Sequence, residues 1–165
     1  MEKRIIKLEI ILSSLLLFIP LILILINGEI RPSISDYAYS KNNQAFVMLL
    51  TLAGSMFVFN GSAYNTKWFN IILGCSLIGV AVTPHLDYAV LHYSFAAIFF
   101  LGSVFAMVFF SSNKQRLFKI IAGFVIIIAL AFSMLTKSIS LLCSEWIGIL
   151  PISVHFIGEA LGKID

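Results

Sequence analysis

The feature that most constrains the fold is a series of long apolar runs spread along the whole chain. The first run covers residues 5–27 and carries only two charged side chains, Lys7 and Glu9. A helix needs about 20 mostly apolar residues to cross the roughly 30 Å hydrocarbon core of a bilayer. Within lipid, a backbone must satisfy its own hydrogen bonds, and a helix does so. We therefore expect an all-α chain that folds in a membrane.

Composition excludes a soluble globular protein. Of the 165 residues, 60% are hydrophobic and only 12% are charged, whereas soluble domains carry about 25% charged residues. The apolar runs cover residues 5–27, 45–60, 68–84, 90–110, 118–135 and 141–161. They predict a polytopic integral membrane protein whose single domain, residues 1–165, is a six-helix transmembrane bundle. The sequence leaves open whether the third run crosses completely, because Pro84 closes its short apolar part.

The distribution of positive charge predicts the orientation. With the N-terminus in the cytoplasm, the inner segments hold eight cations (Lys3, Arg4, Lys7, Lys67, Lys114, Arg116, Lys119 and Lys163) and the outer segments hold three (Arg31, Lys41 and Lys137). Cytoplasmic loops are enriched in Lys and Arg. We therefore expect both termini on the cytoplasmic side of a bacterial inner (plasma) membrane. No basic stripe of the kind that binds nucleic acid is present, so no nucleic-acid partner is expected.

Polar side chains near the expected outer surface form the first group of candidate site residues. They come from the loop after the first span, from the loop before the fourth span, and from the starts of the fourth and sixth spans. The ligand-binding candidates are Ser35, Asp36, His85, Asp87, His92 and Glu145. Ionisable groups in membrane segments are costly and often functional. The alternative interpretation is that outer loops are polar because they are hydrated.

Three of these residues could also be ligands of a divalent metal, which is the one cofactor we consider. Asp36, His92 and Glu145 offer the nitrogen and oxygen ligands that such an ion takes. Alternatively, His92 acts as a base beside a carboxylate, with Ser35 as the nucleophile. The three residues come from separate loops, so no local motif distinguishes these interpretations.

A second polar pair, His155 and Glu159, lies four residues apart on one face of the last span. His155 follows the expected outer end of that helix, near Leu141, by 14 residues, or about 21 Å. The pair therefore belongs to the inner half of the membrane. We favour a hydrogen-bonded pair between helices over a proton or ion relay.

Three stretches resemble a set of small bacterial multipass membrane proteins of unknown function. They are Ser33-Ile-Ser-Asp-Tyr-Ala-Tyr, Leu91-His-Tyr-Ser-Phe-Ala-Ala, and Ser144-Glu-Trp-Ile-Gly-Ile-Leu. Those proteins carry a Ser-x-Ser-x-Tyr-Tyr-like outer loop, a His that opens a later span and a Glu that opens the last one. The resemblance implies that Ser35, His92 and Glu145 are the important positions, and it implies no established activity.

A weaker similarity is to the membrane hydrolase superfamily of alkaline ceramidases and adiponectin receptors. That superfamily uses a Ser, an Asp and three His, two of them spaced as His-xxx-His on the last helix. Here His155-xxx-Glu159 takes that place, with Glu replacing one His, and six spans replace seven. The resemblance implies a metal-dependent lipid hydrolase.

We expect first a non-enzymatic membrane module with an outward-facing polar pocket, either a sensor or binding protein or a membrane subunit for a partner. A soluble cytoplasmic partner would dock on the basic loop of Lys114, Arg116 and Lys119. The alternatives are the metal-dependent hydrolase and, third, a small oligomeric transporter or channel. Pairs of small residues such as Gly158-xxx-Gly162 allow helices to pack closely, within the chain or in a homo-oligomer.

Overall fold

The computed structural model describes residues 2–63, 65–110, 113–136 and 138–163, with the backbone alone at residues 2–5 and 65. In these residues the α-helices are α1 (Glu2–Asn27), α2 (Asn43–Ala63), α3 (Phe69–Val82), α4 (Ala89–Phe105), α5 (Arg116–Thr136) and α6 (Leu141–Ala160). Two 3₁₀ helices, η1 (Ser35–Tyr39) and η2 (Asn65–Lys67), precede α2 and α3, and a π-helical turn, η3 (Ala106–Phe110), extends α4. The expected all-α class is confirmed for the described residues.

Five of these helices are long and apolar enough to cross a membrane: Ile6–Asn27, Asn43–Ala63, Ala89–Phe110, Arg116–Thr136 and Leu141–Ala160. They correspond to five of the six expected spans. Helix α3 matches the third but has only 14 residues, or about 21 Å. It ends at Val82 because Pro84 disfavours helical geometry at Thr83, whose φ and ψ are −117° and 79°.

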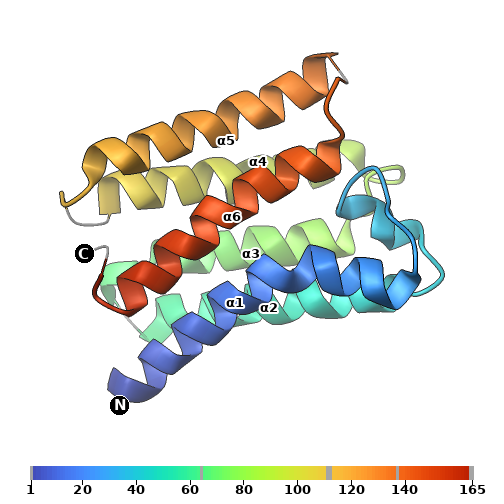
Figure 1. The fold of residues 1–165 in the computed structure, drawn as a ribbon. Coiled ribbons are helices and arrows are strands. Elements are labelled where there is room, and N and C mark those ends of the chain that lie inside the picture. Colours follow the sequence, from blue (N-terminus) through green and yellow to red (C-terminus); the bar gives the residue numbers. More distant parts are fainter. Residues whose placement is uncertain (1, 64, 111–112, 137, 164–165) are drawn as a thin grey trace.

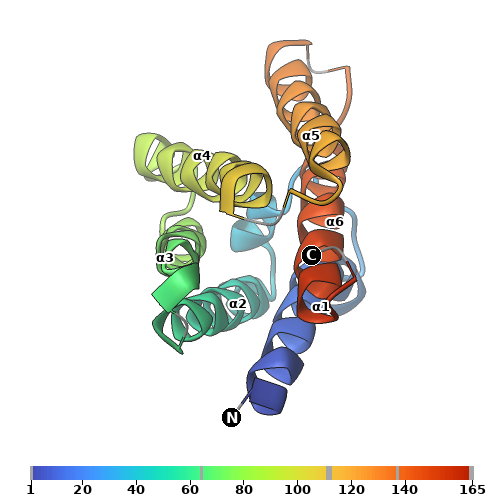
Figure 2. The ribbon, with the colours of Figure 1, turned by 90° about the vertical axis from the view of Figure 1, so that its left-hand side faces the viewer.

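The helices form two layers of three, seen end-on in Figure 2, with α2, α3 and α4 in one layer and α1, α6 and α5 in the other. Helix α1 begins and α6 ends at the same end of the bundle (Figure 1), which we call the terminal end. The opposite end, the η1 end, carries η1 and the connections before α4 and α6. Among the cations used for orientation, Lys137 and the side chains of Lys3 and Arg4 lie outside the described residues.

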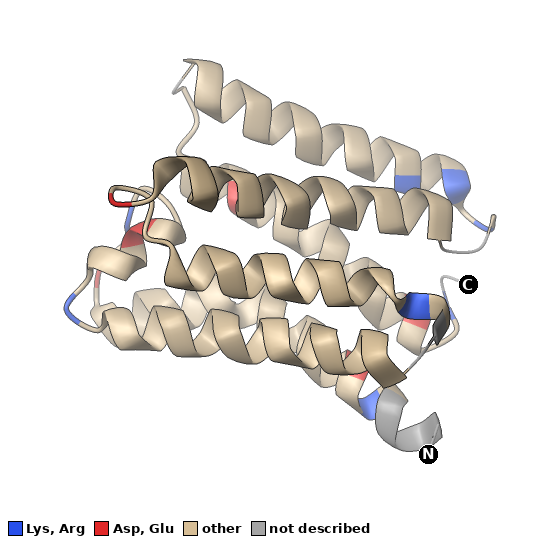
Figure 3. Cartoon of the chain, turned by 180° about the vertical axis from the view of Figure 1, so that it is seen from behind, with Lys and Arg blue, Asp and Glu red and all other residues tan. Residues whose placement is uncertain are grey.

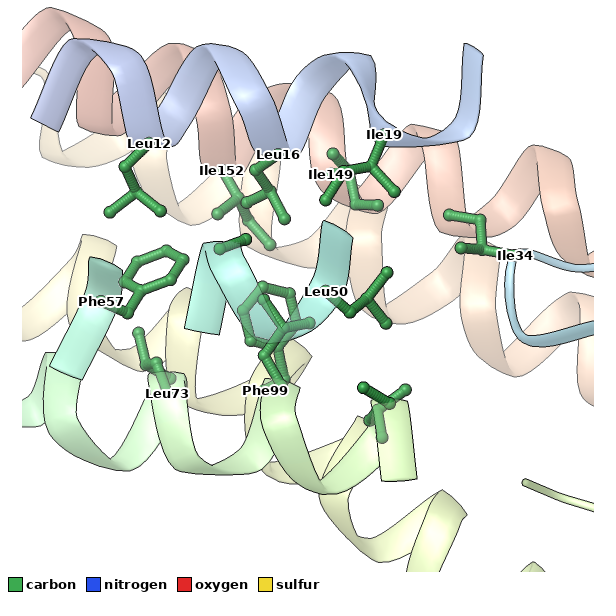
Figure 4. Packing of buried hydrophobic residues seen from close by; sticks show 14 of the residues in the cluster. Leu12, Leu16, Ile19, Ile34, Leu50, Phe57, Leu73, Phe99, Ile149 and Ile152 are labelled. Carbon is green, nitrogen blue, oxygen red and sulfur yellow. The ribbon is translucent and has the colours of Figure 1, made fainter. Parts of the chain in front are cut away.

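The core lies where the two layers meet (Figure 4). Leu12, Leu16 and Ile19 recur along one face of α1 and are each at most 2% exposed. The spacing of four and three residues is that of one helix face, so α1 directs this stripe at the other layer. From that layer, the Phe57 ring packs edge-on against Phe156 of α6, with ring centres 5.4 Å apart. These contacts hold the layers together at mid-bundle.

Small residues allow a close approach of helices α2 and α3. A Cβ atom added to Gly54 would lie 2.7 Å from the carbonyl oxygen of Gly74. A backbone carbonyl cannot move aside as a flexible side chain can, so this crossing requires glycine. Helices packed in lipid commonly use small residues in this way.

Candidate functional site

The segment of residues 28–42 folds into a short polar turn that starts the candidate site. Ser33 Oγ accepts a hydrogen bond from the backbone N–H of Asp36 at 3.0 Å and donates one to Asp36 Oδ2 at 2.9 Å. Ser33 and Ser35 are also bonded, with 3.0 Å between their Oγ atoms. A hydroxyl carries one hydrogen, and that of Ser33 is used on Asp36, so Ser35 is the donor here. Ser35 Oγ is therefore left with acceptor capacity only.

Helix α6 holds this segment from one side. The backbone N–H of Ile34 donates to Glu145 Oε2 at 2.6 Å, across 111 residues of sequence. One turn earlier on α6, the N–H of Leu142 donates to the carbonyl oxygen of Pro32 at 2.7 Å. The first turn of a helix has N–H groups without intrahelical partners, and Pro32 satisfies one of them. Glu145 thus serves as an anchor for the segment and contributes to the site.

The connection between α3 and α4 holds the segment from the other layer. His85 Nε2 lies 3.5 Å from Asp36 Oδ1. The N–H of Leu86 donates to the Tyr39 hydroxyl at 2.7 Å, and the Tyr39 ring packs edge-on against His85. Residues 28–42 therefore bridge the two layers at the η1 end.

His92, in the first turn of α4, is 3% exposed and has a defined tautomer. Its Nδ1 lies 2.6 Å from the carbonyl oxygen of Thr83. A carbonyl can only accept, so Nδ1 carries the hydrogen, and in the neutral ring Nε2 is the acceptor. The His92 and His85 rings are neighbours, with centroids 5.7 Å apart.

Two cavities meet at these residues. The larger, which we call the lateral cavity, has a volume of about 270 Å³ and is lined by α4, α5 and α6. The smaller, central cavity has about 50 Å³ and extends toward α1, α2 and α3. The residues that line both are Ser35, His92, Ala96, Phe100 and Glu145.

The lateral cavity exists because α4 and α5 meet near the terminal end and separate toward the η1 end (Figures 1 and 2). They meet at Gly123, where an added Cβ atom would lie 2.6 Å from Val104 Cγ1. Beyond that point the cavity runs between the helices and is lined by apolar side chains such as Leu101 and Ile127. Both of these also keep much of their surface exposed, at 51% and 41%. The cavity is therefore reachable from the side of the molecule.

The structure brings most of the candidate residues from the sequence together, but not all of them. Ser35, Asp36, His85, His92 and Glu145 meet at the η1 end through the contacts above, and with Ser33 we call them the η1-end cluster. Asp87, two residues from His85, is exposed and lines neither cavity. Within the described residues, no three His, Cys, Asp or Glu side chains are placed to hold a metal ion. The arrangement therefore lends no support to a metal centre of Asp36, His92 and Glu145.

A second polar cluster, at the terminal end, was not anticipated as a unit. Lys67 Nζ lies 2.7 Å from Glu9 Oε1 and 3.2 Å from Glu159 Oε1. Two buried amides extend the cluster: Asn60 Nδ2 donates to Glu9 Oε1 at 2.8 Å, and Asn70 Nδ2 donates to Asn60 Oδ1 at 2.7 Å. These residues come from α1, α2, η2, α3 and α6, so the cluster joins both layers.

The lysine is the charged centre of this cluster. Burial lowers the pKa of Lys67, but the carboxylates of Glu159 and Glu9 outweigh burial and hold that pKa above its ordinary value of 10.5. The expected pair of His155 and Glu159 is also here, with His155 Nε2 4.0 Å from Glu159 Oε2. The sequence held a signal for this cluster, because Glu9 and Asn60 are polar residues within apolar runs. Lys67, which pairs with Glu9, lies 58 residues from it in sequence.

Comparison with known proteins identifies a family. Residues 18–160 match a family model described as a family of unknown function (DUF7103). No curated protein and no solved structure matches the chain. The match agrees with the expectation of an uncharacterised family, and it supports neither the outer-loop motif nor the likeness to ceramidases and adiponectin receptors.

Proposed function

The chain belongs to this family of unknown function, and from its geometry we propose that it is a non-enzymatic binding module of a bacterial inner membrane. Its ligand is an amphiphile with a single alkyl chain, which enters the lateral cavity sideways from the bilayer. The alkyl chain lies between α4 and α5, and the head group meets Ser35, His92 and Glu145 at the η1 end.

Membrane insertion is supported by the outer surface of the bundle. Large apolar side chains are exposed all along it, among them Leu135 at 84%, Val90 at 81% and Leu25 at 73%. In Figure 3 the charged residues gather at the two ends of the helices, and the middle is nearly free of them. Water would penalise such a belt, whereas hydrocarbon would not.

The orientation follows from the same charges. Figure 3 shows most of the described Lys and Arg side chains at the terminal end, where α1 and α5 begin and η2 lies, whereas the segment that joins α1 to α2 carries Arg31 and Lys41 at the η1 end. Under the positive-inside rule the terminal end, with both termini, is cytoplasmic. The η1-end cluster then faces the outer side.

The single observation that carries the ligand proposal is the composition of the lateral cavity. Its walls are apolar along α4 from Tyr93 to Leu101, about 12 Å of helix, and three polar side chains close one end. Small-molecule sites are typically apolar with a few convergent polar groups, and their volumes begin at about 300 Å³. At about 270 Å³ the lateral cavity lies just below this range, which favours a ligand with one alkyl chain over a two-chain lipid.

The ligand proposal is tested with photoreactive single-chain probes. The purified protein, in phosphatidylcholine nanodiscs, is irradiated with dodecyl compounds that carry a diazirine at the chain end. Mass spectrometry should locate the label on residues 93–101 and 127–134. Ala131→Phe fills the cavity and should remove this label, whereas Ile128→Phe, on the exposed face of α5 and outside the cavity lining, should not. Equal labelling of both variants would refute the proposal.

The orientation is tested by cysteine accessibility in intact cells. In a chain with Cys75 and Cys143 replaced by Ser, single cysteines are introduced at Lys41, Leu86 and Asn113. A membrane-impermeant maleimide should label positions 41 and 86 directly, and position 113 only after permeabilisation. Labelling of 41 and 113 from the same side would contradict the topology.

A further inference from the structure

We infer that the lateral cavity selects its ligand by chain length: it accepts an alkyl chain of about ten to twelve carbons, and the contact between Val104 and Gly123 sets the limit. This inference rests on the proposed function and adds the length class of the ligand and the two residues that determine it. It does not depend on the chemistry of the head group.

The side walls of the lateral cavity are single faces of two helices. On α4 the lining residues are Tyr93, Ala96, Ala97, Phe100 and Leu101. On α5 they are Ile127, Leu130, Ala131 and Met134. Steps of three and four residues keep side chains on one face of a helix. Because α4 and α5 run in opposite directions (Figure 1), Leu101 and Ile127 lie together at the inner end of the cavity.

The next residue on each lining face closes this inner end. Val104 comes three residues after Leu101, and Gly123 comes four residues before Ile127. Val104 lies against Gly123, because a Cβ atom added to that glycine would be 2.6 Å from Val104 Cγ1. Gly123 is buried, and Val104 packs against the hydrophobic core. We call this pair the floor of the lateral cavity.

The length of the walls and the volume of the cavity agree on the size of the chain. Tyr93 and Leu101 are eight residues apart, or about 12 Å along α4. A fully extended polypeptide covers about 3.3–3.6 Å for every three backbone bonds, or about 1.2 Å per bond, so about ten bonds span the walls. A water molecule takes about 30 Å³ of liquid volume, and a methylene group is of similar size. A cavity of about 270 Å³ therefore holds about nine methylene groups.

A second pocket adjoins the lateral cavity at the η1 end. It has a volume of about 340 Å³ and shares Tyr93, Met134 and Leu141 with the lateral cavity. Its lining also includes Ser133 and Ser140. This pocket gives room to the head group, and it leaves the distance from the polar end to the floor unchanged.

Both shorter and longer chains are expected to fit less well. The ligand comes from the bilayer, where its methylene groups are already out of water, so selection depends on how well the chain fills the cavity. A shorter chain leaves space above the floor, and the side chains around a void lose dispersion contacts. A longer chain collides with Val104, which is unfavourable in a packed site. Otherwise it bends out between α4 and α5, and its end leaves the cavity.

The test uses octyl, dodecyl and hexadecyl alcohols with a diazirine at the chain end, at equal mole fraction in nanodiscs that hold the full chain. The common head group makes chain length the one variable. Four carbons cover about 5 Å, or about one helical turn. The dodecyl probe should therefore label Leu101 and Ile127, and the octyl probe Ala97 and Leu130, one turn nearer the η1 end. The share of label on residues 93–101 and 127–134 should fall about fivefold from dodecyl to hexadecyl.

A variant of the floor tests the limit directly. Val104→Ala removes two carbon atoms that lie against Gly123, so a tetradecyl probe should label the cavity about threefold more than in the wild type. Val125→Ala is the matched control, because it makes the same change on the exposed face of α5, outside the cavity lining. It should leave tetradecyl labelling unchanged.

The outcomes separate the inference from the proposed function. The chain-length limit is wrong, and the binding module stands, if dodecyl and hexadecyl probes label the cavity equally or if octyl and dodecyl probes label the same residues. Unchanged tetradecyl labelling in a folded Val104→Ala protein also overturns the limit. If no probe labels these residues above the rest of the protein, both are wrong. The series on the wild-type chain decides the inference even if Val104→Ala does not fold.

Discussion

The lysine of the terminal-end cluster gives the most direct test of how this bundle is stabilised. Lys67→Met removes an ammonium that lies 2.7 Å from Glu9 Oε1 and 3.2 Å from Glu159 Oε1. Methionine replaces the stem of the side chain, so the change mainly removes charge and hydrogen bonds. The carboxylates of Glu9 and Glu159 then lose their shared cation, while Asn60 still donates to Glu9 and His155 stays near Glu159.

The magnitude follows from the burial of the three side chains. Breaking a buried ion pair by removing one partner costs about 3–5 kcal/mol, because a charge is left buried without compensation. Exposed pairs contribute about 0–1 kcal/mol. The side chains of Lys67, Glu9 and Glu159 keep 18%, 10% and 14% of their surface. They are therefore close to the buried limit, and we expect Lys67→Met to lower the free energy of unfolding by about 3 kcal/mol.

The assay is unfolding in mixed dodecylmaltoside and SDS micelles, followed by circular dichroism and by the fluorescence of the neighbouring Trp68. Lys41→Met, an exposed lysine at the η1 end, is the matched control and should change the free energy by less than about 0.5 kcal/mol. The double variant Glu9→Gln with Lys67→Met should be more stable than the sum of the single changes by about 1–3 kcal/mol. If Lys67→Met behaves as Lys41→Met does, or if the double variant is additive, the cluster does not stabilise the fold as argued.

Three further predictions concern pH, the η1-end anchor and helix packing. The pKa of Lys67 is raised above 10.5 in the folded protein, so the stability that the charged lysine gives the fold is fully present below that pH and is lost as the pH rises through the folded-state pKa. The difference in thermal midpoint between wild type and Lys67→Met should therefore be constant from about pH 7 to 10 and should shrink above pH 10.5. Glu145→Gln weakens the bond from Ile34 by about 1 kcal/mol, and amide exchange at residues 33–37 should become about fivefold faster, measured by mass spectrometry; unchanged exchange would contradict the anchoring role. Gly74→Ala places a methyl group against the backbone of α2 and should cost about 2 kcal/mol or more in the same micelle assay, whereas Gly102→Ala meets only the movable end of the Leu73 side chain and should cost less.

Much of the site was accessible from the sequence because the number of spans sets which loops share an end. Ser35, Asp36, His85, His92 and Glu145 were expected together on that basis, and they meet at the η1 end. The number of spans could not predict which of the nearby residues His85 and Asp87 joins the cluster. His85 faces Asp36 whereas Asp87 is exposed, and that depends on the backbone path of a short turn after Pro84.

The sequence by itself determined that these helices form and roughly where each lies, because apolar length, Pro84 and the placement of charge act through local chemistry along the chain. Only the tertiary structure decided that Lys67 joins Glu9, 58 residues away, to Glu159. It also decided that α4 and α5 diverge beyond Gly123 to leave the lateral cavity. Pairings and helix crossings depend on which small residues let two backbones approach, and that is settled by packing between distant segments. A run of apolar residues specifies that a helix forms and leaves open the neighbour against which it packs.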